Sequence, residues 1–397
     1  MTERKKIVVV AHDVGGTGGM ERHLEELIMR LKQDAQVTVV AVSMKLADCS
    51  GVRFIRIPVM SKPVPLKMIL FAIGATLRLL FMKHDILHTT GAIVFNRADV
   101  STVHFCHAGY MEATGNSRSK LNRSLLRRWN SLLASSIALS MERFIYKSKR
   151  TSKLVAVSGR VRKELLASFP YQAHEVEVVP NGVDTACFRP KTEEEKQTLR
   201  KRHGLPERGV FALFMGGDWP LKGLDFVIDA FNRLALDYPD LHLIVVGKGD
   251  KEAYAAKIAE GAKERVFFTG KQSNPEEWFG LSDVFVFPSS YETFSLVVHE
   301  AAAAGLVVVS TRVGGVEDLL EDGLNGYYIE RDGERIAMRL RSILGAPEVS
   351  RSLGVQARSK VAALTWDNTY FLMTQVYRRI QGQRYGSRYF ENERTHP

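Results

Sequence analysis

Short apolar runs rich in β-branched residues recur along the whole chain, and longer helical patterns separate them. Most of these runs are continuous rather than alternating, which is typical of strands covered on both faces in a parallel sheet. They are IVVVAH, VTVVAVS, DILHTTG, ADVSTVHFCH, KLVAVS and VEVVP in the first half, and VFALFMGG, HLIVVGKG, RVFFTG, DVFVFPS and LVVVSTR in the second. Because helical segments lie between them, the sequence predicts two α/β units. A chain of 397 residues, 45% of them hydrophobic, can bury two cores of ordinary size.

The division between the two units is predicted near PNGVDTACFRPKTEEEKQ, where a Pro-Asn-Gly turn leads into a polar, charged stretch. We therefore expect a first α/β domain over residues 1–183 and a second over 184–365. The amphipathic segment TWDNTYFLMTQVYRRI predicts a last helix over residues 366–382. The polar tail at 383–397 is expected to be disordered.

Two carboxylates, Glu292 and Glu300, interrupt the otherwise apolar or small segment SSYETFSLVVHEAAAAG. The preceding DVFVFPSS reads as a strand that ends in a loop, and Phe294–Ala304 has the Ala-rich character of a helix packed closely on a sheet. Glu292 is thus expected in the loop at the carboxyl end of a strand, and Glu300 about two turns into the helix. Ligands of open α/β sheets bind at that end of the strands.

The start of this helix offers anion donors as well. The backbone amides of Phe294, Ser295 and Leu296 would lack intrahelical partners and would lie at the positive end of the helix dipole. Amides that hold a phosphate, beside carboxylates that accept hydrogen bonds from hydroxyls, suit a phosphorylated sugar. A helix-capping glutamate and a salt-bridged helical glutamate would explain the same pattern.

A glycine-rich stretch, GGTGGM, follows the first strand and could be mistaken for a dinucleotide-binding loop. The spacing GxGxxG would require glycine at position 21, where the chain has Glu21. An NAD-dependent oxidoreductase is therefore a weak alternative from another class.

The three cysteines, Cys49, Cys106 and Cys187, are widely spaced and odd in number. They form neither a disulfide framework nor a metal-ligand pattern, which indicates a reducing, cytosolic setting. No Asp-x-Asp motif stands at a strand end, so no metal is expected. The apolar run after MTERKK is too short for a signal peptide, and no apolar run reaches the roughly 18 residues that span a bilayer.

Positive charge is concentrated in the first part of the chain. Residues 1–150 hold 23 Lys and Arg against 11 Asp and Glu, whereas the remainder holds 32 against 33. Such asymmetry indicates an acidic partner for the first domain, such as an anionic membrane or a phosphorylated substrate. Because no RNA- or DNA-binding signature accompanies it, nucleic acid is not expected.

Several motifs occur in an order that identifies a family. They are GGMERHLEEL, VSGRVRKEL, VPNGVD, MGGDWPLKGLDFVIDAF, VVGKGD, the segment from Glu292 to Glu300, and GGVEDLLEDGLNGYYI. Together they resemble the retaining glycosyltransferases of family four, group-one type, which include sucrose and glycogen synthases and bacterial mannosyltransferases. The resemblance implies the GT-B fold: two Rossmann-like domains that face each other across a cleft, with a C-terminal helix that returns to the first domain.

The resemblance also implies a role for each matching residue. Glu300 would bind the ribose hydroxyls of a nucleotide sugar, and Glu292 the hydroxyls of the transferred sugar. Lys222, by itself a surface lysine before a helix, would stabilise the leaving diphosphate. The loop and helix-start positions expected near the diphosphate are Gly18, Gly19, Gly216, Phe294, Ser295 and Leu296.

Two details depart from the family pattern. Members usually carry Gly-Arg in the turn before the KG lysine, whereas Gly217 and Asp218 occupy this region here, so a phosphate-binding cation is missing. Arg160 or Arg312 could replace it. Ser295 stands where glycine is common, but a serine can still present its backbone amide.

Family members often place a histidine near the sugar at the end of a first-domain strand, and VSTVHFCHAGY offers His104 and His107. Alternation along a strand would put them on opposite faces, so we do not expect both to enter the cleft in the same way, and we favour His107. A histidine bonded within a buried strand is the alternative for either.

The resemblance implies transfer of a sugar, with retention, from a nucleotide diphosphate to a hydroxyl of a glycan or lipid-linked acceptor. The donor is expected to be UDP- or GDP-linked rather than ADP-linked, with no further cofactor, and the pathway to be cell-envelope polysaccharide, lipopolysaccharide or glycolipid synthesis. A non-catalytic binding protein of the same fold is the alternative. The apolar segment 68–82 and nine basic residues between Arg118 and Arg150 predict a cytoplasmic protein docked at the inner face of the membrane. A core-facing helix with a solvated basic face explains the same pattern.

Overall fold

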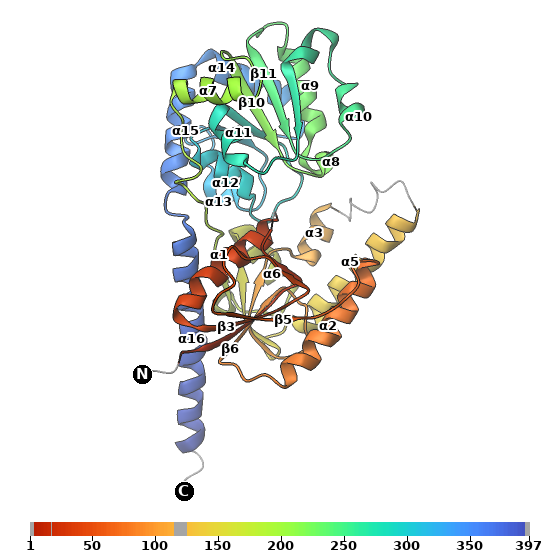
Figure 1. Ribbon diagram of the computed structural model, residues 1–397, viewed down its shortest axis with the longest axis vertical. Coiled ribbons are helices and arrows are strands. Elements are labelled where there is room, and N and C mark those ends of the chain that lie inside the picture. The colour runs from red at the N-terminus through yellow and green to blue at the C-terminus, as the bar shows by residue number, and fades with distance from the viewer. Residues whose placement is uncertain (1–3, 17, 115–124, 394–397) are drawn as a thin grey trace. The chain divides into compact units, whose positions relative to one another are not determined.

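The structure, a computed structural model, describes residues 4–16, 18–114 and 125–393. The chain forms two compact units, Met1–Gly182 together with Trp366–Pro397, and Val183–Thr365. In each unit, helices cover both faces of a parallel sheet (Figure 1).

The N-terminal unit is built on a seven-stranded parallel sheet in the order β5-β3-β1-β6-β7-β8-β9. Its strands are β1 (Lys6–Val10), β3 (Gln36–Ala41), β5 (Val52–Arg56), β6 (Ile86–Thr90), β7 (Ala98–Val103), β8 (Thr151–Ala156) and β9 (Val176–Val178), and β2 (Asp13–Val14) pairs with β4 (Ser43–Met44) apart from it. Its helices are α1 (Gly19–Asp34), α2 (Val64–Leu80), α3 (His107–Thr114), α5 (Leu125–Ile145), α6 (Gly159–Ser168), the short 3-10 helix η1 (Ala173–Glu175) and α16 (Trp366–Glu393).

The continuous apolar character of the strands has a direct structural cause. In β1, Ile7 and Val9 pack into a core with α1 and α16, whereas Val8 and Val10 pack into a second core with α2. Successive side chains of a strand point to opposite faces, so a sheet covered on both sides requires apolar residues at every position. The long runs seen in the sequence follow from this arrangement.

The last helix continues beyond its expected end. α16 begins at Trp366 as the sequence predicts, but it extends to Glu393 rather than ending at residue 382. Residues 383–393, for which the sequence predicts disorder, are thus drawn as part of this helix, while 394–397 lie outside the described residues. The segment is polar but contains a single glycine and no proline, so nothing in its backbone stops a helix that is already formed.

The C-terminal unit has a six-stranded parallel sheet in the order β12-β11-β10-β13-β14-β15. Its strands are β10 (Val210–Met215), β11 (Leu241–Val246), β12 (Val266–Gly270), β13 (Val284–Phe287), β14 (Val307–Ser310) and β15 (Tyr327–Tyr328). Its helices are α7 (Glu193–Arg202), α8 (Trp219–Lys222), α9 (Leu224–Leu234), α10 (Lys251–Ala255), the 3-10 helix η2 (Glu260–Arg265), α11 (Pro275–Leu281), α12 (Leu296–Ala303), α13 (Val316–Leu319), α14 (Gly333–Gly345) and α15 (Pro347–Val361).

Candidate active site

In the C-terminal unit, the candidate site lies where the strand order reverses. From β10 the chain proceeds to β11 and β12 on one side of the sheet, and it then returns to place β13, β14 and β15 on the other. The carboxyl ends of the parallel neighbours β10 and β13 thus form a topological switch point, where open α/β sheets bind their ligands. The segments that follow these two strands contain Gly216, Lys222 and Glu292.

Lys222 and Glu292 are brought together at this point. The Lys222 ammonium forms an ion pair with the Glu292 carboxylate, and the Ser289 hydroxyl donates a hydrogen bond of 2.8 Å to the same carboxylate oxygen. The ammonium also lies 5.3 Å from the centre of the Phe287 ring. Both charged side chains keep part of their surface exposed, so the pair is held in place and remains open to a ligand.

Gly216, at the end of β10, lies against the Lys222 side chain. A Cβ atom at Gly216 would be 3.5 Å from Cγ of Lys222, and the backbone φ of 153° favours glycine. Its carbonyl accepts a hydrogen bond of 3.0 Å from Trp219 Nε1. The structure therefore places three of the predicted donor-site residues, Gly216, Lys222 and Glu292, next to one another.

The helix after Glu292 starts later than the sequence suggests. α12 begins at Leu296 rather than at Phe294, because Ser295 adopts the left-handed conformation, with φ 62° and ψ 60°. Glu300 is therefore the fifth residue of α12, little more than one turn into the helix. The left-handed conformation also gives a physical reason for the glycine that is common at position 295 in the family.

The loop of Glu292 is held by a second motif, which follows β14. Gly314 donates a backbone hydrogen bond of 3.1 Å to the Glu292 carbonyl, and the Ser295 hydroxyl donates one of 3.1 Å to the Gly314 carbonyl. A Cβ atom at Gly315 would lie 1.9 Å from the Phe294 carbonyl oxygen. These two glycines, which the sequence reasoning did not assign to the site, are needed because backbone packs directly on backbone here.

Glu300 and its neighbour His299 lie buried on α12. Burial lowers the pKa of His299 to about 4, so this imidazole is neutral near pH 7. Its Nδ1 lies 3.1 Å from the Ser295 carbonyl, to which the neutral ring donates, and the ring stacks on Phe294 at 4.2 Å between centres. His299 thus fixes the start of the helix that carries Glu300.

Arg331 holds the two site loops and was not found from the sequence. Its guanidinium donates to the carbonyl of Leu221 at 2.6 Å and to that of Pro288 at 2.9 Å, and also to Pro220. Helix α8, which follows β10, and the loop after β13 are therefore tied to one cation. A single arginine after a strand carries no sequence pattern that would predict this role. The hydrogen bond from Ser289 to Glu292 could not be predicted from the sequence either.

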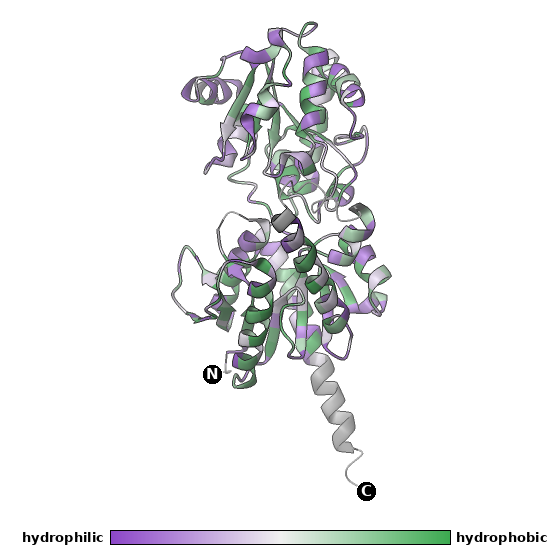
Figure 2. Ribbon diagram, turned by 90° about the vertical axis from the view of Figure 1, so that its right-hand side faces the viewer, coloured by the Kyte–Doolittle hydropathy of each residue, from purple (hydrophilic) through white to green (hydrophobic). Residues whose placement is uncertain are grey.

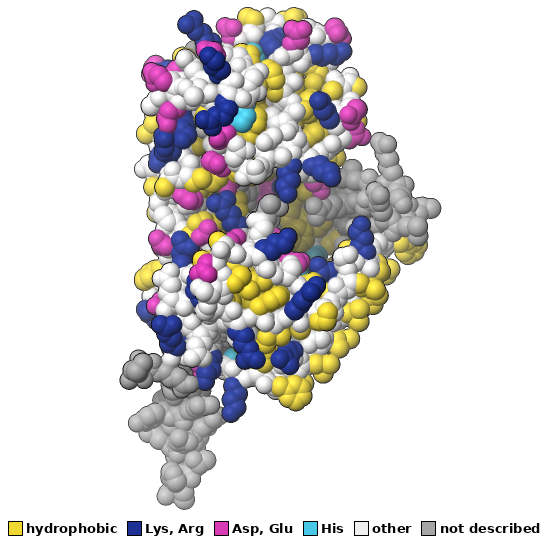
Figure 3. Space-filling model, viewed as in Figure 1, with side chains coloured by type: hydrophobic (Ala, Val, Ile, Leu, Met, Phe, Trp, Pro, Cys, Tyr) yellow, Lys and Arg dark blue, Asp and Glu magenta, His cyan; other side chains and the backbone are white. Residues whose placement is uncertain are grey.

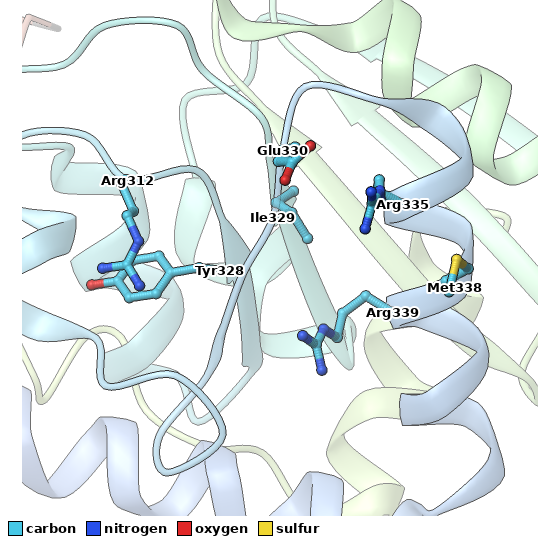
Figure 4. Close-up of a pocket in the computed structure, with 7 residues that line it drawn as sticks. All are labelled: Arg312, Tyr328, Ile329, Glu330, Arg335, Met338 and Arg339. Atoms are coloured by element: carbon cyan, nitrogen blue, oxygen red, sulfur yellow. The ribbon is translucent and has the colours of Figure 1, made fainter.

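The two arginines considered as replacements for the missing cation have other surroundings. Arg160 lies on α6 of the N-terminal unit, 3.6 Å from Glu164. Arg312 stacks on the ring of Tyr328 at 3.7 Å. It lines a cavity of about 660 Å³ that Arg335 and Arg339 face from α14 (Figure 4).

In the N-terminal unit, a cavity of about 420 Å³ opens at the carboxyl ends of β1, β6 and β7. Both His104 and His107 line it, and their surroundings differ. Strand alternation does not extend to these two histidines, because β7 already ends at Val103 and α3 begins at His107. The other polar side chains of the cavity are His12, Lys67, Thr90, Glu142 and Tyr146.

His107 is oriented by Glu142, a buried carboxylate of α5. One carboxylate oxygen accepts the backbone amide of His107 at 2.9 Å and lies 2.8 Å from its Nδ1, while the other accepts the amide of Ala108 at 3.2 Å. Glu142 therefore caps the start of α3 and fixes the orientation of the His107 ring. Glu142 was visible in the sequence as the sole acid of a basic stretch, but its role was missed.

His104 has a different environment. Its ring packs edge to face on His23, with 4.6 Å between centres. Burial, and then the neighbouring His23 and His88, lower the pKa of His104 well below its usual range. His104 is therefore a neutral imidazole near pH 7.

Gly18 and Gly19 lie at the start of α1 in the N-terminal unit, with Gly18 as the N-cap. A Cβ atom at Gly18 would be 1.9 Å from a carboxylate oxygen of Glu21. The glutamate that breaks the dinucleotide spacing thus occupies the space beside the glycine loop. Among the residues that the structure describes, no group of three or more His, Cys, Asp or Glu side chains could hold a metal ion.

Comparison with known proteins finds a family model for each half of the chain. The family model described as Glycosyltransferase Family 4 matches residues 17–186, and the model described as Glycosyl transferases group 1 matches residues 195–360. A D-inositol 3-phosphate glycosyltransferase of Jonesia denitrificans is 30% identical over 246 residues, which are 59% of this chain and 58% of the relative. The match thus spans little more than half the length of this curated relative.

Solved glycosyltransferases share the fold over nearly the whole chain. WaaG, a glycosyltransferase involved in lipopolysaccharide biosynthesis, superimposes with a TM-score of 0.75 at 19% identity, over 91% of this chain and 98% of WaaG. Anabaena HepE in complex with UDP-glucose gives a TM-score of 0.69 at 17% identity, over 95% of this chain and all of HepE. With one family model on each unit, the chain belongs to the glycosyltransferases of family four, group-one type, and has the GT-B fold.

Proposed function

We propose that this protein transfers a sugar, with retention of anomeric configuration, from a nucleotide diphosphate to a hydroxyl of a glycan or lipid-linked acceptor. The observation that carries the proposal is the Lys222–Glu292 ion pair at the switch point of the C-terminal sheet. A cation for a diphosphate and a carboxylate for sugar hydroxyls are thus adjacent. Glu300 follows on α12, in the position that the family uses for the ribose.

Each group has a definite part in the proposed reaction. The bond between the anomeric carbon and the diphosphate oxygen breaks, and Lys222 and the amides at the start of α12 stabilise the negative charge left on the diphosphate. The acceptor oxygen bonds to the same face of the anomeric carbon, and its proton passes to the leaving phosphate. His107, oriented by Glu142 through Nδ1, would bind a hydroxyl in the N-terminal cavity through its other ring nitrogen.

The donor is proposed to be UDP- or GDP-linked, and the acceptor to belong to the cell envelope. The fold relative HepE was solved with UDP-glucose, which makes this compound the first donor to test. The D-inositol 3-phosphate glycosyltransferase relative acts, by its name, on a phosphorylated polyol. The excess of positive charge in the N-terminal part supports an anionic acceptor or membrane at the cytoplasmic face.

The test is slow hydrolysis of the donor by the purified full chain, measured with UDP-, GDP- and ADP-glucose, with thermal shift as a companion readout. We expect one of the three nucleotide sugars to raise the melting temperature of the protein, and glucose to be released from that same compound. Because Lys222 supplies positive charge at the diphosphate, release is expected to persist with EDTA. Loss of release in EDTA, restored by magnesium, would contradict this part.

The alternative of a non-catalytic binding protein gives a different result in the same assay. Such a protein would be stabilised by a nucleotide sugar without releasing sugar, even with acceptor glycans present. The intact set of Lys222, Glu292 and Glu300 favours catalysis. No stabilisation by any of the three donors would overturn the proposed function itself.

A further inference from the structure

Helix α2 presents an apolar stripe to the outside of the N-terminal unit. Its buried side, with Phe71 and Leu79, packs on the sheet beside β1 and β6. The opposite side is nevertheless apolar too: Leu77 and Phe81 are 55% and 86% exposed. The exposed members recur every three or four residues and so share one side: Leu66, Ile69, Leu70, Ile73, Leu77, Leu80 and Phe81. A surface helix normally keeps that side polar, so this stripe requires an explanation.

The neighbouring helix extends the same surface. α5 packs against α2, and its Leu133 and Phe144 are exposed, as is Phe95 from the loop after β6. These three side chains line a shallow apolar hollow of about 320 Å³. Viewed from this side, both helices are largely hydrophobic (Figure 2). In the space-filling view, hydrophobic side chains gather along the edge over α2, and Lys and Arg side chains lie beside them (Figure 3).

A basic cavity lies at the carboxyl-terminal end of α2. It measures about 530 Å³ and includes Phe81 and Met82 in its wall. Six cations line it, and no Asp or Glu is found among its described lining residues: Arg4, Lys6, Lys32, Arg53, Arg78 and Lys83. Lys32 is paired with Asp48 at 2.5 Å, whereas Arg53, Arg78 and Lys83 are exposed. A cavity of this charge beside exposed Phe81 suits a phosphate attached to an apolar molecule.

The other end of α2 belongs to the cavity of the candidate site. Val64, Lys67 and Met68, in its first turns, line the cavity of His104 and His107. A helix of this length spans about 25 Å at 1.5 Å per residue. One helix thus connects a basic cavity, an exposed apolar stripe and the candidate acceptor cavity.

We propose that α2 docks this protein on an anionic phospholipid membrane, with its apolar stripe among the acyl chains and a lipid phosphate in the basic cavity. Charge complementarity favours a membrane over a protein partner, because cations stand at both ends of a purely apolar stripe, as in helices that lie in the bilayer interface. No helix in the described ranges is long and apolar enough to cross a membrane. The stripe is therefore assigned to the interface plane.

This docking extends the proposed function. Its consequence for the acceptor rests on that function, because only a glycosyltransferase would need to reach a lipid-linked acceptor. With α2 in the interface, the cavity of His107 and Glu142 opens at the level of the headgroups. A lipid-linked acceptor could then enter without leaving the membrane. The basic stretch predicted for the same role lies partly outside the described residues, at Arg118, Lys120 and Arg123.

The experiment is co-sedimentation of the full chain with vesicles of phosphatidylcholine alone or mixed with phosphatidylglycerol. We expect binding to the anionic vesicles and little to the neutral ones. The double variant Arg53→Gln/Arg78→Gln should lower the partition onto anionic vesicles about thirtyfold. Ile73→Glu/Leu77→Glu should abolish the binding to both, because it places carboxylates in the acyl region. All four positions are exposed, so the fold should persist.

Matched controls are available on the C-terminal unit. Arg341→Gln/Arg351→Gln removes the same charge, and Leu236→Glu/Val355→Glu exchanges apolar residues that are more exposed than Ile73 and Leu77. Both should bind vesicles like the unmodified protein. Three results would overturn the docking. The control and test pairs could weaken vesicle binding equally, the unmodified protein could bind neither kind of vesicle, or the protein could prove to be a dimer that Ile73→Glu/Leu77→Glu dissociates. Donor hydrolysis, measured without vesicles, should be unchanged in every variant, so this failure is distinguishable from failure of the proposed function.

Discussion

The ammonium of Lys222, at the end of α8, and the carboxylate of Glu292 form an ion pair between the segments that follow two neighbouring parallel strands. The contact satisfies both charges in the structure, and the Ser289 hydroxyl keeps the carboxylate in place. A donor diphosphate would compete for the ammonium and release the carboxylate toward the sugar hydroxyls. In the proposed reaction, the pair would therefore link the binding of the leaving diphosphate to the release of the carboxylate that is proposed to bind the sugar.

Replacement of Lys222 by alanine should reduce turnover far more than the binding of donor. Loss of a group that stabilises charge in the transition state costs typically about 2.7 to 4 kcal/mol, or a hundredfold or more in kcat. Steady-state donor hydrolysis measures this. Lys257→Ala is the control, because this lysine forms an ion pair with Asp225 on an exposed surface of the same unit. Equal kcat values for the two variants would refute the role of Lys222.

Replacement of Glu300 by glutamine should weaken the binding of the nucleotide. In the proposed contact with two ribose hydroxyls, hydrogen bonds to a charged group contribute roughly 1.5 to 3 kcal/mol, which is about ten- to a hundredfold in Kd. Glutamine keeps the size of this buried side chain, so the fold should persist. Calorimetric titration with UDP and GDP measures the effect, and circular dichroism checks the fold. An unchanged Kd would exclude the ribose contact.

Much of the C-terminal half of the site was predictable, because its parts follow strands with clear patterns. Lys222 and Glu292 lie after the runs VFALFM and VFVF, and strands that are parallel neighbours bring their following loops together. The start of α12 was not predictable. It depends on the left-handed conformation of Ser295, which is imposed by tertiary contacts with Gly314 and Gly315 rather than by local propensity.

In the N-terminal half, the sequence identified the histidines but not their arrangement. The run ADVSTVHFCH reads as one strand, yet β7 ends at Val103. The capping of α3 by Glu142, some 35 residues away in sequence, decides where the helix starts and therefore where His107 points. Long-range capping of this kind leaves no local pattern. The same limitation hid the guanidinium of Arg331, whose partners are carbonyls that any residue could supply.

Substitution of Gly315 by alanine should disrupt the donor site. Its φ of 78° disfavours any side chain, and the added Cβ would lie 1.9 Å from the Phe294 carbonyl oxygen, so the Glu292 loop must move. We expect at least a tenfold loss of nucleotide affinity by calorimetry, about 1.4 kcal/mol. Gly323→Ala is the matched control, because its φ of 77° is the same but no atom lies within 4 Å of the added Cβ. The prediction fails if both variants bind the nucleotide equally.

The buried histidines of the N-terminal unit should make its stability depend on pH. Burial lowers the pKa of His23 from 6.5 to about 4, so the folded unit keeps this ring neutral while the unfolded chain binds a proton below pH 6.5. Because the unfolded state then holds more protons, the free energy of unfolding falls as the pH falls from 6.5 to about 4. For one group with such a shift, the loss approaches about 3 kcal/mol.

We expect His23→Leu to reduce that loss, whatever it does to stability near neutral pH. The substitution removes one titrating ring and also the neighbouring charge that lowers the pKa of His104. Urea unfolding at pH 6.5 and at pH 4, followed by fluorescence, measures the difference, with the indole of Trp366 as a local reporter 6.2 Å from the His23 ring. His174→Leu, at an exposed position of the same unit, is the control. If His23→Leu loses as much stability between these two pH values as the unmodified chain does, the titration of His23 does not govern the acid sensitivity of this unit.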